Sequence, residues 1–271
     1  MNRRQLWISL LLLWSLAPML WQLISSFTTT AALVDGGVPF LQRWTLIHYR
    51  QLLSSDPPFW RFLLNSTVLA SASTVLTIAL AIPAAYGLVR LPQRWLRVSR
   101  ALIAGAALFP YVLLFLALLE LARSLNLGNS LLALAIPYSA LSLPLALLLL
   151  TAAFEGLPKD LDDAAKLEGM SLVQRLRWVL IPLIAPATAS TAILVFLFAW
   201  NEYPIALTWL SRSEQLTLPV AMARIAGSSV YSVPYGAYAA ATVLGALPLL
   251  LLVLLFQRQI VSGLTNGAVK G

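Results

Sequence analysis

Long uncharged stretches alternate with short charged segments along the whole chain. Each uncharged stretch has about 20 residues or more, the length that a helix needs to cross the hydrocarbon core of a bilayer. No segment alternates polar and apolar residues over about 10 positions, as the strands of a membrane barrel do. A helix also satisfies its own backbone hydrogen bonds in lipid. The pattern therefore predicts an all-α, polytopic membrane protein with six transmembrane helices. The uncharged stretches are Gln5–Val34, Phe62–Val89, Ala101–Leu119, Ser124–Phe154, Trp178–Asn201 and Ile225–Gln257.

The densest apolar part of each stretch gives the expected bounds of each helix. We expect a single transmembrane domain over residues 1–271. The first stretch is longer than the apolar core of about 7–15 residues that a signal peptide carries, so it is interpreted as a retained helix. The helices are expected near 6–25, 63–89, 101–122, 131–154, 184–207 and 237–256.

The basic residues are distributed unevenly over the segments that connect these helices. Twelve of the 18 lie in residues 1–5, 90–100, 155–178 and 257–271, and the other six lie on the opposite side. Cytoplasmic segments of membrane proteins are enriched in Lys and Arg. Both termini, together with the long segment 155–182, are therefore expected in the cytoplasm.

Composition narrows the possible functions. The chain is 60% hydrophobic and only 10% charged, whereas soluble domains carry about 25% charged residues. It has no cysteine and a single histidine, His48, so we expect no metal and no cofactor of its own. The net charge of +8 is explained by the cytoplasmic loops, so the expected surrounding is the lipid bilayer and no nucleic-acid partner is expected. There is no G-x-x-x-x-G-K-[ST] loop for ATP and no catalytic constellation.

The segment 155–182 differs from the rest of the chain because it holds half of the ten acidic residues. Pro158 suits the start of a short helix and Gly169 its end, since glycine readily adopts the left-handed conformation. Ser171 and Gln174 fit a capping box that begins a second helix. On the first helix we expect an apolar side of Leu161, Ala164, Ala165 and Leu167, and a polar side of Asp162, Lys166 and Glu168.

The run Asp163-Ala-Ala-Lys-Leu-Glu-Gly169 resembles the EAA motif of binding-protein-dependent ABC importer permeases. That motif reads E-A-A-x-x-D-G-A and is followed by a hydrophobic-x-L-P element, whose place is taken here by Val179-Leu-Ile-Pro182. Asp163 replaces Glu and Glu168 replaces Asp, which keeps the charge at both positions. Met170 replaces a small residue and is the larger departure.

Three further runs extend the resemblance toward the C-terminus. Ala199-Trp-Asn-Glu-Tyr203 is similar to the AWN(D/E)(F/Y) run in the fifth helix of carbohydrate permeases, and Leu216-Thr-Leu-Pro-Val220 resembles a stretch of the following external loop. Residues 256–271 resemble the terminus of the MalG-like branch. Together with the EAA-like run, they cover residues 157–271 in the expected order.

The resemblance implies a type I ABC importer permease fold and a transport subunit of the bacterial inner membrane rather than an enzyme. The implied partners are a second, homologous permease, an ABC ATPase dimer that holds ATP and Mg, and an extracytoplasmic sugar-binding protein. In the family, the EAA helix sits in a groove of the ATPase and transmits its closure to the membrane helices. The implied coupling residues are Asp163, Ala164, Ala165, Glu168, Gly169 and Met170.

A sugar path needs polar or aromatic groups at membrane depth, and the candidates are Trp200, Asn201, Glu202 and Tyr203. Asn201 and Glu202 have oxygens that accept hydrogen bonds from sugar hydroxyls, and Trp200 or Tyr203 offers a ring for stacking on a pyranose face. A charge at the bilayer centre costs roughly 2.5–3.5 kcal/mol, so Glu202 is expected near water. The alternative is that Glu202 marks the outer end of the fifth helix or pairs with an arginine of the partner permease.

The sequence thus predicts a permease subunit that forms half of the path for a sugar and couples to a separate ATPase. The branch suggests a di- or oligosaccharide or a glycosylated compatible solute, similar to maltose, trehalose or glucosylglycerol. The alternative is an ion-coupled secondary sugar carrier acting alone. Such carriers usually have inverted repeats and discontinuous helices, and a carrier leaves the segment 155–182 without a role.

Overall fold

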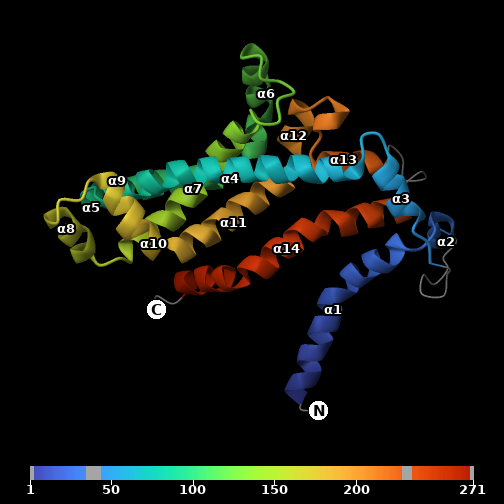
Figure 1. Ribbon diagram of the computed structural model, residues 1–271, viewed down its shortest axis with the longest axis horizontal. Helices are drawn as coiled ribbons and strands as arrows, with labels where there is room; N and C mark the ends of the chain where they lie inside the picture. The colour runs from blue at the N-terminus through green and yellow to red at the C-terminus, as the bar shows by residue number, and fades with distance from the viewer. Residues whose placement is uncertain (1–2, 35–43, 228–233, 269–271) are drawn as a thin grey trace. The chain divides into compact units, whose positions relative to one another are not determined.

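The computed structural model describes residues 3–34, 44–227 and 234–268, and every regular element in these ranges is a helix (Figure 1). This confirms the predicted all-α class. Contacts divide the chain into two compact units, one formed by residues 1–64 with 216–251 and the other by residues 65–215 with 252–271.

The first unit contains the first helix of the chain and the segments that pack around His48. The imidazole is buried, and its Nε2 atom lies 2.9 Å from the carbonyl oxygen of Thr28. A Cβ atom at Gly236 would overlap the same ring, so only glycine lets the backbone approach it this closely. The helices of this unit are α1 (Arg3–Ser26), α2 (Thr30–Val34), α3 (Ile47–Ser54), α13 (Leu218–Ile225), the first turns of α4 (Phe59–Val89) and the first part of α14 (Tyr235–Ala268).

The second unit is built on α4, α7 and α11, which contribute small and apolar side chains to one core. The core is a cluster of buried residues that includes Ala81 and Ala85 of α4, Leu150 of α7 and Val195 of α11. Further along the same contact, the Ser139 hydroxyl donates a hydrogen bond of 3.0 Å to a backbone carbonyl of α4. The remaining helices of this unit are α5 (Gln93–Leu108), η2 (Tyr111–Leu114), α6 (Phe115–Ser124), α7 (Ala135–Glu155), α8 (Lys159–Leu167), α9 (Leu172–Gln174), η3 (Arg175–Leu180), α10 (Ile181–Leu183), α11 (Ala185–Asn201), α12 (Pro204–Trp209) and η4 (Ser213–Gln215).

Among the residues that the structure describes, four helices are long and apolar enough to cross a membrane, namely α1, α4, α7 and the part Tyr235–Gln257 of α14. Two pairs also pass this test but are bent, by 77° within residues 93–124 and by 83° within residues 172–201. Counting each bent pair as one span gives six. The number of six spans and the cytoplasmic side of both termini remain predictions.

Two of the expected helices are interrupted, so the continuous bounds 101–122 and 184–207 are wrong. The first breaks between α5 and η2 at Phe109 and Pro110, and the second breaks at Glu202 and Tyr203, directly before Pro204. Proline lacks a backbone N–H and disfavours the helical conformation of the residue before it. Phe109, directly before Pro110, accordingly has an extended backbone with φ −65° and ψ 130°. Tyr203, directly before Pro204, leaves the helical conformation with φ −121° and ψ −51°, and the motif residue Glu202 before it is extended, with φ −66° and ψ 127°.

Candidate functional site

The turn after α8 explains both the glycine and the methionine of the EAA-like run. Gly169 has a φ of +78°, its N–H donates to the Lys166 carbonyl at 3.0 Å, and the Met170 N–H donates to the Ala165 carbonyl at 3.1 Å. These two bonds form a Schellman motif, in which the residue after the glycine is often apolar. The prediction that Gly169 ends the helix is confirmed, and Met170 occupies the position where an apolar side chain is favoured.

The second helix of this loop begins with the predicted capping box. The Ser171 N–H donates to the Gln174 side chain at 2.8 Å, and the Gln174 N–H donates to the Ser171 hydroxyl. The helix then widens into a π-helical segment, η3, over Arg175–Leu180. Such single wide turns are rare and occur often at functional sites. The capping box could be read from the sequence, whereas nothing in the sequence indicated the π-helical segment.

The side of α8 that faces the protein differs from the predicted one. Asp162 is 2% exposed and Ala165 is 6% exposed, whereas Leu167 is 90% exposed. Leu161 and Ala164 also face outward. The expected sides agree with the structure at Ala165, Lys166 and Glu168. They are wrong at Asp162, which is buried with cationic partners, and at Leu161, Ala164 and Leu167, which are exposed.

The Asp162 carboxylate is the centre of a charged cluster that sequence reasoning missed. Arg175 Nη1 donates to its Oδ1 at 2.7 Å, the Tyr86 hydroxyl donates to its Oδ2 at 3.0 Å, and Arg90 forms an ion pair with the same Oδ2. Lys166, one turn later, lies 3.4 Å from it. The sequence contains one indication that Asp162 is buried. It lies three residues before Ala165, and this spacing puts both residues on one face of a helix.

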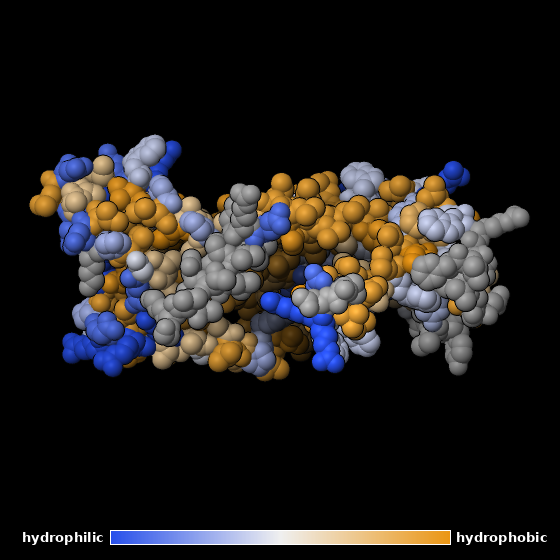
Figure 2. All heavy atoms as spheres, turned by 90° about the horizontal axis from the view of Figure 1, so that it is seen from below, coloured by the Kyte–Doolittle hydropathy of each residue, from blue (hydrophilic) through white to orange (hydrophobic). Residues whose placement is uncertain are grey.

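The outward face of α8 carries a different charge pair. Lys166 donates to the Asp163 carboxylate at 2.8 Å, and this hydrogen bond, followed by the lysine charge, lowers the pKa of Asp163. Asp163, Ala164 and Glu168 are all exposed. Figure 2 shows hydrophilic side chains gathered at this end of the second unit, where α5, α8 and α9 lie. Asp163 therefore stays ionised at neutral pH on a surface open to solvent.

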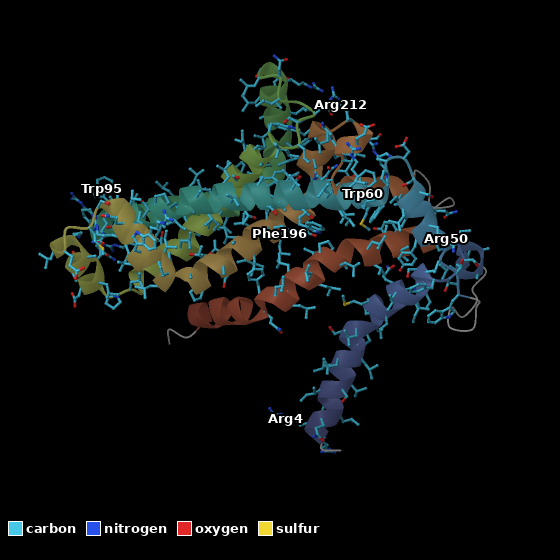
Figure 3. All side chains as sticks on the ribbon, viewed as in Figure 1. Arg4, Arg50, Trp60, Trp95, Phe196 and Arg212 are labelled. Atoms are coloured by element: carbon cyan, nitrogen blue, oxygen red, sulfur yellow. The ribbon has the colours of Figure 1, made fainter. Side chains whose placement is uncertain are left out.

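The second group of motif residues lies at the opposite end of α11. Figure 3 shows Trp95 at the α8 end of this unit, Phe196 within α11 and Arg212 beyond the other end. The structure thus separates the EAA-like residues from the sugar-path candidates by the length of α11 (Ala185–Asn201).

Glu202 is 2% exposed, and its carboxylate is hydrogen-bonded within the chain. Its carboxylate accepts hydrogen bonds from the N–H groups of Ile205 at 2.9 Å and Ala206 at 3.1 Å, and from the Tyr138 hydroxyl. A carboxylate is favourable at a helix N-terminus, where the first N–H groups lack partners. The expectation that Glu202 lies near water rather than at the bilayer centre stays a prediction, and within the chain its carboxylate caps α12. Its position directly after α11 agrees with the alternative that it marks the end of that helix.

The other three candidates differ in accessibility. Trp200 is 3% exposed and stacks on Phe196, with ring centroids 5.7 Å apart. Asn201 is exposed, although its Nδ2 donates to the Leu197 carbonyl at 2.8 Å, and Tyr203 is half-buried. Asn201 and Tyr203 are therefore the accessible candidates, whereas Trp200 is buried against Phe196.

Comparison with known proteins supports the same functional class. Residues 77–266 match the family described as "Binding-protein-dependent transport system inner membrane component". The sulfoquinovosyl glycerol transport system permease protein of Agrobacterium fabrum is 39% identical over 97% of this chain and 92% of its own length. The trehalose transport system permease protein of Mycobacterium tuberculosis is 37% identical over 95% and 93%, respectively.

A solved bacterial ABC transporter involved in the import of the acidic polysaccharide alginate has a similar fold. Its matching chain gives a TM-score of 0.77 at 22% identity and covers 94% of each chain. A family of inner membrane components agrees with the long apolar helices described above. The chain belongs to the binding-protein-dependent transport system inner membrane component family, as a multi-pass permease of the sugar ABC importer type.

Proposed function

We propose that this chain forms half of the translocation path of a sugar importer and that a separate ATPase drives it through residues 155–182. The partners in this proposal are a second, homologous permease, an ABC ATPase dimer that holds ATP and Mg, and an extracytoplasmic sugar-binding protein. The membership of the family supports an ATP-driven importer over an ion-coupled carrier. In this proposal the chain contributes half of the translocation path and the coupling helix, and the ATPase partner hydrolyses ATP.

The observation that carries the proposal is the two-sided arrangement of α8. One side is held by the buried Asp162, and the other exposes Leu161 and Leu167 together with the small Ala164. An exposed apolar surface on a short charged helix is typical of a protein interface. A small residue such as Ala164 lets the helix backbone approach a groove closely.

The coupling residues take different parts in this proposal. Asp163, Ala164 and Glu168 face outward and are proposed to contact the ATPase directly. Gly169 and Met170 instead form the turn that orients α8. Ala165, which faces inward, seats the helix against the permease.

The sugar path is proposed to pass the break between α11 and α12. Asn201 and Tyr203 would contact the sugar, with Trp200 and Glu202 holding the backbone around them. The substrate is proposed to be a di- or oligosaccharide or a glycosylated compatible solute. Relatives named for sulfoquinovosyl glycerol and for trehalose support this class.

Copurification and reconstitution test the proposal. A tagged chain should bring a second permease and an ATPase from the membrane of its own cell. Vesicles that contain this complex, the binding protein and internal ATP should take up sugar, and a non-hydrolysable ATP analogue should stop the uptake. Uptake by the purified chain alone, driven by a proton or sodium gradient, would instead identify a carrier.

A further inference from the structure

Three segments distant in sequence converge on the Asp162 carboxylate. Tyr86 lies in the last turn of α4 and Arg90 directly follows that helix, Asp162 lies within α8, and Arg175 is the first residue of η3. We propose that Asp162 is a positioning residue that makes α8, α4 and η3 move as one body when the ATPase displaces α8. This inference rests on the proposed coupling function and adds the route by which the displacement enters the membrane helices.

The cluster is organised around shared groups rather than separate pairs. Arg175 Nη1 reaches both Asp162 Oδ1 at 2.7 Å and the Tyr86 hydroxyl at 3.2 Å. The Arg90 guanidinium lies 4.9 Å from the centroid of the Tyr86 ring while it pairs with Asp162. A displacement of any one member therefore strains bonds to the other segments.

The same tyrosine extends the cluster into the core. Its ring packs edge-on against Phe154 near the end of α7, with centroids 5.9 Å apart and an interplanar angle of 71°. Tyr86 and Phe154 belong to the buried cluster that also contains Leu180 of η3 and Val195 of α11. Since close-packed interiors transmit displacement rather than absorb it, a movement of Asp162 reaches α4, α7 and α11.

The turns at both ends of α8 hold the two ends of the helix. Before it the chain passes through Gly156, Leu157 and Pro158, with Leu157 packed against the buried cluster, and after it comes Gly169 in the left-handed conformation. The buried carboxylate adds a connection from the middle of α8 to α4 and η3.

The charge of Asp162 matters because it is shared between cations. Its side chain is 3% exposed, whereas the side chains of Arg175 and Arg90 are 12% and 38% exposed. Removing the charge leaves two guanidinium groups beside each other around a buried amide, and a buried charge without its partner is strongly unfavourable. The arginines are then expected to separate, which releases α8 from α4 and η3.

The test uses the complete complex in vesicles and compares Asp162→Asn with Asp160→Asn. Asp160 lies on the same helix, is exposed, and undergoes the same loss of charge. The chain has no cysteine, so a single Ala164→Cys probe reports by crosslinking whether α8 still sits on the ATPase. The measured quantity is sugar taken up per ATP hydrolysed.

For Asp162→Asn we expect normal assembly and crosslinking, continued ATP hydrolysis, and a fall in sugar per ATP of roughly 5- to 150-fold, the usual range of coupling between sites. Asp160→Asn should keep the normal ratio. Asp162→Glu, which keeps the charge and lengthens its reach by one methylene, should recover part of the ratio.

A normal ratio of sugar to ATP in Asp162→Asn would overturn the inference. If that variant does not assemble, Tyr86→Phe decides, because it keeps the ring on Phe154 and removes only the hydroxyl bonds. An unchanged ratio in an assembled Tyr86→Phe complex overturns the inference, and a lowered ratio supports it. Failure of the proposed function has a different result, namely uptake by the unaltered chain without its ATPase.

Discussion

Replacing Gly169 tests the turn that sets the direction of α8, and its effect can be calculated because sterics do not interfere. No atom lies within 4 Å of a Cβ placed at this glycine, so alanine meets no clash. The φ of +78° is the remaining obstacle. The left-handed conformation costs a residue with a Cβ roughly 1–2 kcal/mol, which is a factor of about 5–30 in the population of the turn.

Three substitutions should therefore fall in a fixed order. Gly169→Asn is expected to be mildest, because asparagine visits the left-handed region more readily than alanine does. Gly169→Ala should lower uptake by up to the 5–30-fold factor of the turn population. Gly169→Pro should abolish it, since proline fixes φ near −65° and removes the N–H that bonds to Lys166.

The assay is sugar uptake in cells, normalised to the amount of chain in the membrane by immunoblot. Hydrogen exchange of the α8 amides in the purified complex reports the turn itself, and should speed up in the same order. Normal uptake with Gly169→Pro would refute the argument that this turn positions α8. Equal loss for alanine and asparagine would show that φ is not the cause.

Three other changes test features of the structure outside this turn. Glu202→Ala removes the cap of α12 and should lower the unfolding free energy by about 1.5–3 kcal/mol, the range for hydrogen bonds to charged groups; thermal melting of the purified complex measures it, and Glu202→Gln should fall in between. Gly236→Ala should lower the melting temperature because its Cβ overlaps the His48 ring, and adding His48→Ala should restore part of the loss. Because the pKa of Asp163 is lowered by its lysine partner, the pair stabilises α8 at neutral pH. This contribution should be lost as the pH falls through the ordinary value of 3.8 and below. Hydrogen exchange of α8 that is unchanged across this range would contradict the assignment.

Local chemistry made part of the loop predictable from sequence. Gly169, Ser171 and Gln174 act within a few residues of themselves, so their spacing alone indicated the turn and the capping box. The long helices were equally predictable from the sequence, because an uncharged stretch of about 20 residues has few alternatives to a membrane span.

The interruptions of the helices were harder to predict, although the prolines beside them are visible in the sequence. Pro110 lies within one interruption and Pro204 directly follows the other, whereas Pro83 and Pro248 lie inside the continuous helices α4 and α14. A proline can be tolerated where neighbouring groups satisfy the freed carbonyl. The presence of a proline alone therefore does not tell whether a helix is kinked or interrupted at that position.

Pairs distant in sequence were missed for a similar reason. Asp162 meets Tyr86, 76 residues earlier, and Glu202 meets Tyr138, 64 residues earlier. On a helical pattern an acid is assigned to the solvent side unless its partner is known. Asp162 was assigned to the polar side on that ground, whereas Glu202 was expected near water because of the cost of a charge in the bilayer, and both are buried within the chain.

The two motifs share an arrangement that changes how their residues should be interpreted. In each, a buried acid bonds within the chain, Asp162 to side chains and Glu202 to the backbone of α12. The residue beside it in sequence faces outward: Asp163 beside Asp162, and Asn201 beside Glu202. A buried acid positions the site through bonds within the chain, so its loss should reduce turnover while binding of the partner or sugar is kept. An exposed neighbour makes the contact itself, so its loss should first weaken affinity. Separating these two effects in kinetics distinguishes the residues that build this permease from those that bind on its surface.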